Sequence, residues 1–268
     1  PQSSVMFKIK DFWFNPAWED ALKSADLFDI EAVTQRDFDW FEAPNRRRGG
    51  WSGVTRIVLN PNTPQAKQKA VFLKIQQNHF YIAPNTGFRK RLTFEREFAA
   101  MTALRPRCPA IPEVLMFAKW TNDGNCGAIL VTEALDGWHL LRDWQLGKAS
   151  FPKPNQSTLK RALEAIAATS RQLNQAGWIH MCYSAKHIFI RPQANSDEFD
   201  VRVIDLEKTR KRFGLGRRTV KDSSHFLRHT PKLSETDKLN YLKAYFKTDS
   251  FSNAQQKLIR QMRGAPKV

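Results

Sequence analysis

One short segment of the sequence concentrates side chains that can do chemistry. Residues 177–190 read G-W-I-H-M-C-Y-S-A-K-H-I-F-I, so His180, Cys182, Lys186 and His187 fall within eight positions. Imidazole, thiol and amine groups act as acids and bases, as nucleophiles or as metal ligands. The segment is therefore the first candidate for a chemical site.

A zinc site is one interpretation of this segment, with His180, Cys182 and His187 as ligands. The sequence offers no fourth ligand nearby at the spacing that tetrahedral zinc sites use. The other two cysteines, Cys108 and Cys126, are widely spaced and form no C-x-x-C pair. This pattern favours reduced thiols in a cytoplasmic protein.

A lysine and a glutamate form a second candidate. Lys74 lies in the predicted strand 71–75, on the same face as Phe72, and Glu97 lies on the apolar face of the predicted helix 93–104. A lone buried charge is costly, and two opposite charges relieve each other by pairing. We therefore predict a Lys74–Glu97 ion pair; the alternative is that each side chain reaches solvent alone.

A glycine-rich turn precedes the lysine strand. The stretch R-R-R-G-G-W-S-G-V places Gly49, Gly50 and Gly53 at the mouth of a hairpin whose first strand is predicted over residues 54–59. In protein kinases a glycine-rich hairpin covers the phosphates of the nucleotide, a strand lysine neutralises them and a helix glutamate orients the lysine. The spacing here is not G-x-G-x-x-G, so the glycines alone are a weak signal.

The order of later segments continues to match a kinase. A predicted strand over residues 128–132 ends in Glu133-Ala134-Leu135, the position of the linker whose backbone contacts adenine in kinases. His180 falls where kinases begin H-R-D-L-x-x-x-N, His187 takes the place of the asparagine, and Asp205 takes the place of the aspartate of D-F-G. One carboxylate beside a second ligand suits magnesium bridged to phosphates.

The remaining periodicity predicts the framework around these residues. Hydrophobic spacing and caps indicate strands over residues 36–43, 187–191 and 201–206, a long helix over residues 157–176 that ends at Gly177, and C-terminal helices that begin at Ser234 and Ser252.

These motifs resemble those of the bacterial lipopolysaccharide kinases of the Kdo/WaaP family, and most closely its InaA-type branch. The resemblance covers about residues 36–246. It rests on L-K-I around Lys74, F-E-R-E-F around Glu97, the segment 177–190, V-R-V-I-D-L-E-K-T-R around Asp205 and K-D-S-S-H-F-L from Lys221.

The resemblance implies an α+β, protein-kinase-like fold of two lobes. Residues 1–35 would form an N-terminal extension, residues 36–135 a small β-rich N-lobe with one key helix, and residues 136–268 a mainly helical C-lobe. It further implies ATP and Mg²⁺ as cofactors, and phosphorylation of a sugar hydroxyl in the lipopolysaccharide core or a related anionic glycolipid.

The resemblance also implies roles for individual residues. Nucleotide would contact Gly49, Gly50, Gly53, Lys74, Glu97, Glu133 and Leu135; the metal ion would contact His187 and Asp205; and His180 and Asp222 would support the catalytic loop.

The catalytic loop departs from kinases at its centre. Met181 replaces the arginine and Cys182 replaces the catalytic aspartate, while Leu206-Glu207 replaces Phe-Gly. Cys182 would serve as a base only if Lys186 and His187 lowered the pKa of its thiol; otherwise it is a small buried hydrophobe. The sequence thus predicts either an enzyme, with Cys182, His187 and Asp205 in the catalytic site, or a pseudokinase that acts as a stress-response scaffold or regulator.

The charge of the chain is strongly positive. It has 43 Lys+Arg against 26 Asp+Glu, a net charge of +17, with basic clusters at residues 46–48, 89–91, 210–212 and 217–218. Such a field attracts phosphate-rich partners, such as an anionic glycolipid, an anionic membrane surface or nucleic acid. No nucleic-acid-reading motif accompanies it, which disfavours nucleic acid.

The sequence contains no run of eighteen apolar residues and no basic-then-apolar order at its start. We therefore expect a cytoplasmic protein, peripheral at the inner face of the inner membrane.

Overall fold

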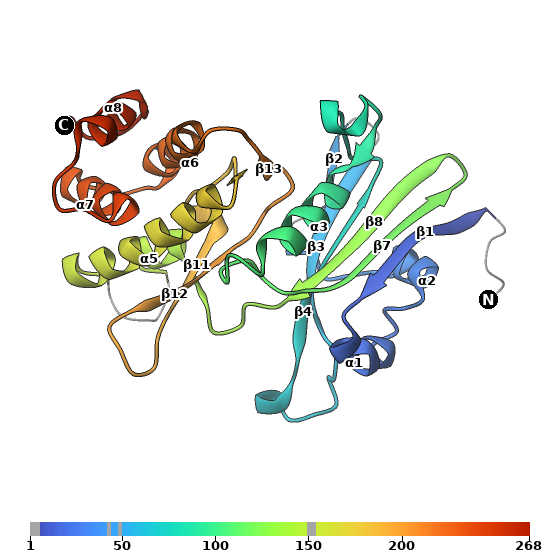
Figure 1. The fold of residues 1–268 in the computed structure, drawn as a ribbon. Helices are drawn as coiled ribbons and strands as arrows, with labels where there is room; N and C mark the ends of the chain where they lie inside the picture. The colour runs from blue at the N-terminus through green and yellow to red at the C-terminus, as the bar shows by residue number, and fades with distance from the viewer. Residues whose placement is uncertain (1–5, 42–43, 48–49, 149–153) are drawn as a thin grey trace. The chain divides into compact units, whose positions relative to one another are not determined.

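The computed structural model describes residues 6–41, 44–47, 50–148 and 154–268. The chain separates into two compact units (Figure 1). The first holds residues 1–99 and 113–136 and is built on a β-sheet, and the second holds residues 100–112 and 137–268 and is mainly helical. Each unit is described in turn.

The first unit contains an antiparallel sheet that has six strands within the described residues. Its order is β1-β7-β8-β4-β3-β2. The strands are β1 (Phe7–Phe14), β2 (Asn45–Arg47), β3 (Gly50–Val58), β4 (Ala70–Gln77), β7 (Val114–Asn122) and β8 (Asn125–Glu133). Strand β4, which carries Lys74, is therefore paired on both sides, with β3 and β8.

Alternation along β4 decides which side chains face the core. Val71, Leu73 and Ile75 are buried, whereas Phe72 and Lys74 are half-buried. Successive side chains of a strand point to opposite faces. The main core of this unit therefore lies on the face opposite Lys74, and Phe72 shares the less buried face with Lys74.

Residues 6–35, the described part of the expected N-terminal extension, contribute to the first unit. Strand β1 pairs with β7. Helices α1 (Glu19–Ser24) and α2 (Ile30–Gln35) bury Leu22, Ile30 and Val33 in the core of the sheet. Two short strands, β5 (Phe80–Tyr81) and β6 (Arg91–Leu92), form a ribbon before helix α3 (Thr93–Leu104).

The strand predicted over residues 36–43 is wrong for the part that is described. Residues 36–41 form only an isolated bridge, between Trp40 and Thr55, and residues 42–43 lie outside the described residues. The Trp40 ring packs edge-on against Phe38 and Trp51. Aromatic packing holds this segment on the sheet together with two hydrogen bonds to β3, from Phe41 N to Val54 O at 3.0 Å and from Thr55 Oγ1 to Asp39 O at 2.8 Å.

The second unit surrounds a long helix. Helix α5 (Gln156–Gln175) packs against α6 (Leu215–His229), α7 (Glu235–Phe246) and β12 (Phe199–Val203) (Figure 1). The other elements are α4 (Leu141–Gln145), α8 (Asn253–Gln261), β9 (His139–Leu140), β10 (Trp178–Ile179), β11 (Ile188–Pro192) and β13 (Arg210–Lys211).

Several predicted boundaries of this unit are confirmed. Helix α5 buries Leu163, Ile166 and Leu173 and is followed by Gly177, whose positive φ of 101° lets the chain turn out of the helix. Ser234 caps α7, and Ser252 forms a capping box with Gln255 at the start of α8. The strands differ slightly, because β11 begins at Ile188 and β12 ends at Val203.

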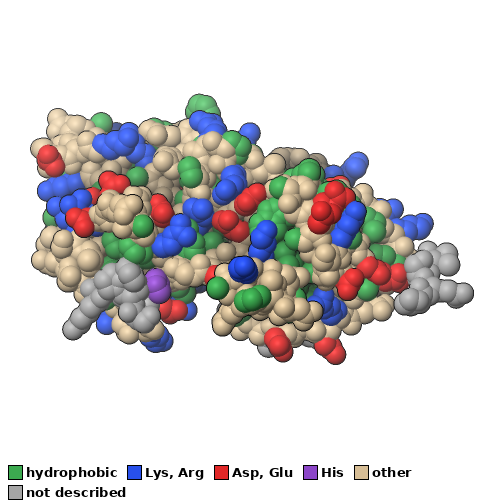
Figure 2. Space-filling model, turned by 90° about the horizontal axis from the view of Figure 1, so that it is seen from below, with side chains coloured by type: hydrophobic (Ala, Val, Ile, Leu, Met, Phe, Trp, Pro, Cys, Tyr) green, Lys and Arg blue, Asp and Glu red, His purple; other side chains and the backbone are tan. Residues whose placement is uncertain are grey.

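Basic side chains are spread over the surface. On the face drawn in Figure 2, lysine and arginine lie among acidic and apolar side chains rather than in one block. Within the described residues, no helix is both long enough and apolar enough to cross a membrane.

Candidate functional site

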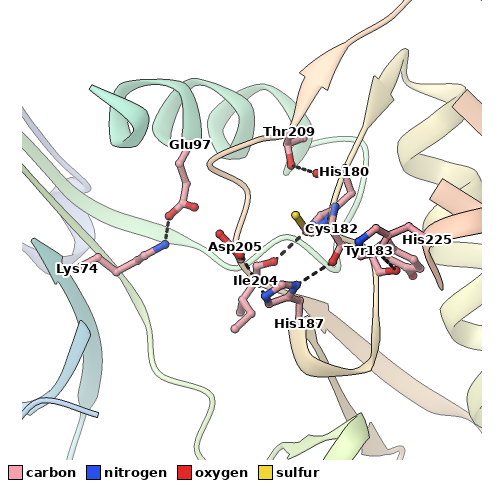
Figure 3. A network of polar contacts seen from close by, with 10 residues as sticks. All are labelled: Lys74, Glu97, His180, Cys182, Tyr183, His187, Ile204, Asp205, Thr209 and His225. Carbon is pink, nitrogen blue, oxygen red and sulfur yellow. Dashed lines mark hydrogen bonds and ion pairs between the residues drawn. The ribbon is translucent and has the colours of Figure 1, made fainter. Parts of the chain in front are cut away.

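The first unit contains the predicted lysine–glutamate pair. Lys74 Nζ, from the middle of β4, forms an ion pair with Glu97 Oε1, from the second turn of α3 (Figure 3). The side chain of Glu97 is only 2% exposed. The ammonium group of Lys74 also lies 4.9 Å from the centroid of the Phe94 ring. The predicted ion pair is therefore confirmed.

The start of α3 is fixed to β4 by a residue that the sequence did not single out. Buried Gln76 donates from Nε2 to Thr93 Oγ1 at 2.7 Å, and its Oε1 accepts from the backbone N of Phe94 at 3.0 Å. Gln76 lies two residues after Lys74 and therefore on the same face of the strand. These bonds hold the first turn of α3, just before Glu97, to the strand that carries Lys74.

A second lysine–glutamate pair joins α3 to the sheet. Lys119 Nζ, from β7, lies 2.9 Å from Glu95 Oε1, and Glu95 Oε2 accepts from the backbone N of Leu92 at 2.9 Å. Both partners are half-buried. This pair resembles Lys74–Glu97 in its chemistry and in the elements it joins.

The predicted nucleotide glycines lie in strand β3 where the structure describes them. An added Cβ at Gly53 would come within 2.7 Å of the Trp40 ring, and one at Gly50 within 2.4 Å of the carbonyl oxygen of Asn78. Gly49 lies outside the described residues. Local packing therefore requires a residue without a Cβ at both described positions, whether or not a phosphate lies beside them.

The predicted linker residues follow the end of β8. Glu133 is half-buried and Leu135 is buried. The backbone N of Glu133 donates to Glu113 O at 3.1 Å, and that of Ala134 donates to Ala70 O at 3.3 Å. Contact of Glu133 and Leu135 with adenine stays a prediction.

In the second unit, a buried carboxylate anchors the segment that follows α5. Asp222, on α6, accepts from the backbone N of His180 at 2.9 Å, from the backbone N of Met181 at 3.1 Å and from Asn174 Nδ2 at 2.8 Å. Burial raises the pKa of Asp222 to about 6, and the three donors counteract that rise. The bonds from His180 and Met181 accompany a left-handed conformation of Met181, with φ 77°.

His180 links this loop to the end of β12. Its Nδ1 accepts from the backbone N of Cys182 at 3.1 Å, which leaves Nε2 to donate to Ile204 O at 3.0 Å. Burial lowers the pKa of His180 to about 4, so the ring is neutral at physiological pH. Thr209 Oγ1 completes the link by donating to His180 O at 3.2 Å.

Because both of its ring nitrogens are engaged, His180 is not a metal ligand. The zinc interpretation loses one of its three ligands for this reason. Among the described residues, no group of three or more His, Cys, Asp and Glu side chains is arranged to hold a metal ion.

The side chains of His187 and Asp205 lie next to each other beside the same loop (Figure 3). His187 Nδ1 lies 2.8 Å from Cys182 O and must donate to it, which directs Nε2 to within 3.1 Å of Asp205 Oδ2. His187 ends a 3-10 turn, Ala185–His187, rather than beginning a strand, and Asp205 has a positive φ of 63° just after β12.

This pair fits a divalent ion that is also bound by phosphates. Mg²⁺ in such sites uses one or two protein carboxylates and keeps its other positions for phosphate oxygens and water. At such a site Asp205 would supply the carboxylate and His187 Nε2 would supply the second donor. An imidazole nitrogen is a softer ligand than the asparagine oxygen of kinases.

Cys182 does not have the character of a thiol base. Burial, followed by the negative charge of Asp205, raises the pKa of the Cys182 thiol, and the opposing effects of Lys208 and Lys186 are smaller. Neighbouring positive charge does not outweigh burial and Asp205, so the condition for a thiol base, a lowered pKa, is not met. The hydrogen bond between His187 and Cys182 is made by the carbonyl of Cys182.

Asn174 is a further residue of the site that sequence reasoning missed. Its Nδ2 donates to Asp222 Oδ2 and to Trp178 O, its Oδ1 accepts from the Tyr245 hydroxyl, and its backbone O accepts from Arg218 Nε. The sequence did contain a signal for it: a polar amide side chain stands on the buried face of α5, three residues before Gly177.

The chain has the protein-kinase-like two-lobe fold. One lobe is the β-rich unit with the lysine–glutamate pair, and the other is the helical unit with the histidine loop and the aspartate at a strand end. The profile of the lipopolysaccharide kinase (Kdo/WaaP) family matches residues 31–245, and the chain belongs to this family. The predicted fold class and family are confirmed.

The chain is also similar to two individual proteins, one by sequence and one by structure. Protein InaA of Escherichia coli (strain K12) is 26% identical over 208 residues, which cover 78% of this chain and 90% of that protein. The solved structure of WaaP in complex with acyl carrier protein superposes with a TM-score of 0.61 at 19% identity. The match covers 93% of this chain and 92% of that one. At that identity the structural likeness shows the fold alone.

Proposed function

We propose that this chain transfers the γ-phosphoryl group of ATP to a sugar hydroxyl of the lipopolysaccharide core, or of a related anionic glycolipid. The observation that carries the proposal is the buried Lys74–Glu97 pair, because a lysine held by an inward glutamate is the phosphate-neutralising device of kinases. Family membership and the net charge of +17 support an anionic lipid-borne acceptor at the inner face of the inner membrane.

Each group has a definite task in this proposal. ATP with Mg²⁺ supplies the phosphoryl group and part of the charge neutralisation. Lys74 binds phosphate oxygens while Glu97 fixes its direction, and Asp205 and His187 hold the metal ion. His180 and Asp222 keep the loop in shape, as their backbone contacts require.

Nucleotide binding tests the proposal directly. Lys74→Met should weaken the binding of ATP with Mg²⁺ by about tenfold or more, because a charge-assisted contact with phosphate is lost. Lys119→Met removes the matched pair with Glu95 on the same helix and should leave ATP affinity within about twofold of wild type. Isothermal titration calorimetry measures both.

Absence of ATP binding to the wild-type protein would refute the proposal. Equal losses in Lys74→Met and Lys119→Met would mean that the lysine acts on the position of α3 rather than on the nucleotide.

A pseudokinase is the second candidate, favoured by Cys182 and the raised pKa of its thiol. Phosphoryl transfer proceeds chiefly by positioning and charge neutralisation, so an enzyme without the catalytic aspartate is slow rather than inactive. In an active kinase, Cys182→Asp should therefore increase turnover by roughly a hundredfold, the effect of a general base. Cys182→Ser, which has no carboxylate, should not.

The readout is ADP release with lipopolysaccharide core glycolipid as the acceptor. ATP binding with no turnover in either wild type or Cys182→Asp would establish the pseudokinase instead.

A further inference from the structure

Residues 208–221, here called the basic-aromatic segment, combine charge with exposed apolar side chains. Seven of its residues are lysine or arginine and none is acidic. Phe213 is 96% exposed and Leu215 is 46% exposed. A phenylalanine almost wholly in water is unusual for a residue with an ordered backbone on either side.

The backbone before Phe213 is held firmly. Strand β13 pairs with β10, so that Lys211 lies opposite Trp178. Arg212 N then donates to Gly177 O at 3.1 Å. The segment is therefore hydrogen-bonded to residues just after α5, and this pairing continues as far as Arg212, the residue before Phe213.

The backbone after Phe213 is held as well. Arg218 donates from Nε to Asn174 O and from Nη1 to Arg212 O, both at 2.6 Å. Gly214 turns the chain into α6 with a φ of 89°. These bonds fix the backbone on both sides of the Phe213 side chain, so the turn presents the ring outward.

The charge continues along α6. Arg217, Lys221 and Arg228 are all exposed and are spaced by four and seven residues, which places them on one face of the helix. Lys211 and Arg212 are exposed at the other end of the segment. Along the chain, Phe213 and Leu215 thus stand between two groups of cations.

Projecting apolar side chains between cations match the boundary between lipid headgroups and acyl chains. The cations meet anionic phosphates there, and a protruding ring enters a soft medium that needs no preformed pocket. A protein partner would have to offer a matching cavity, and single-stranded nucleic acid would be better served by several stacked aromatics than by one ring and a leucine.

We propose that the basic-aromatic segment is a docking surface for an anionic lipid membrane. Phe213 and Leu215 enter the apolar boundary, and Lys211, Arg212 and Arg217 contact lipid phosphates. The inference rests on the proposed function only in that docking would bring the chain to a lipid-borne acceptor; binding itself needs neither ATP nor turnover.

Co-sedimentation with vesicles tests the surface. The full chain should bind vesicles that contain phosphatidylglycerol and not vesicles of phosphatidylcholine alone, and added salt should weaken binding. Phe213→Ala should reduce binding by roughly tenfold, because a phenyl group no longer enters the lipid. The double variant Arg212→Glu, Arg217→Glu should abolish it.

Phe88 provides a matched control. It is 71% exposed and is followed by Arg89-Lys90-Arg91. It is therefore also an exposed phenylalanine beside a basic cluster, but outside the basic-aromatic segment. Phe88→Ala should bind vesicles as wild type does. Unchanged binding in Phe213→Ala, or an equal loss in Phe88→Ala, would overturn the proposal in favour of diffuse attraction.

Two further measurements separate this inference from its rivals. ATP affinity should be the same in wild type and Phe213→Ala. Vesicle binding by a wild-type chain that binds no ATP would refute the proposed function and leave the docking surface standing. Failure to bind vesicles, together with Phe213-dependent binding of acyl carrier protein or single-stranded RNA, would overturn the lipid assignment.

Discussion

At the scale of single residues, the loop after α5 is defined by two buried ionisable groups with opposite responses to burial. Burial raises the pKa of Asp222 to about 6 and lowers the pKa of His180 to about 4. In both cases the neutral form is favoured by the loss of water. Each group therefore makes the stability of the fold depend on pH, and the two dependences oppose each other.

The sign of each dependence follows from proton binding. The folded protein holds the Asp222 proton more tightly than the unfolded chain, so this group makes stability fall as pH rises from 3.8 to about 6. The folded protein holds the His180 proton less tightly, so this group makes stability rise with pH between about 4 and 6.5.

Asp222→Asn should expose the His180 dependence alone. Relative to wild type, the free energy of unfolding of this variant should rise between pH 3.8 and about 6, by at most about 1.4 kcal/mol per pH unit. His180→Gln should show the opposite slope relative to wild type. Urea unfolding at a series of pH values measures both, and a pH-independent difference for either variant would contradict the assignment.

At the scale of elements, strand β3 lies beneath an aromatic layer that restricts its side chains. Trp40 covers Gly53, and an added Cβ there would come within 2.7 Å of the ring. The ring also packs against Phe38 and Trp51, which limits its freedom to move away. Glycine at position 53 is thus explained by packing within the first unit.

Gly53→Ala should lower the free energy of unfolding by about 1–3 kcal/mol, the usual cost of overpacking a closed site. Trp40→Leu combined with Gly53→Ala should cost less than the sum of the two single changes by at least about 0.5 kcal/mol, because the smaller side chain makes room. Denaturant unfolding of the four proteins gives this coupling. Strictly additive costs would mean that the ring moves aside freely.

Elements with regular apolar spacing could be predicted from the sequence, and elements with polar buried faces could not. Helix α5 and the caps of α7 and α8 follow simple patterns. Helix α6 was not predicted because its buried face includes Thr219, Asp222 and Ser223, which are polar side chains rather than an apolar stripe.

The sheet was predicted incompletely for a related reason. Strand β7 begins with five consecutive buried residues, Val114 to Ala118, and such a run has no strand period to detect. Within the site, Lys74, Glu97 and Asp205 were predicted because kinases place them in a fixed order. Gln76, Asn174 and Thr209 were missed because their roles arise from contacts between segments far apart in the sequence.

At the scale of the whole molecule, the net charge of +17 is unevenly placed along the chain. Residues 208–221 alone contribute seven positive charges and no negative ones. On the face drawn in Figure 2, basic side chains have acidic side chains near them. The proposed docking surface concentrates this charge, so its binding to anionic vesicles should weaken steeply as ionic strength rises.

The bonds of Asp222 also bear on how this family can diverge. Two of its three donors are backbone N–H groups, of His180 and Met181, and the bond from Cys182 to the His180 ring is likewise made by the backbone. The side chains at positions 181 and 182 carry none of these contacts. Substitutions at these two positions therefore leave the bonds in place, so the loop can keep its shape while the side chains at its centre change.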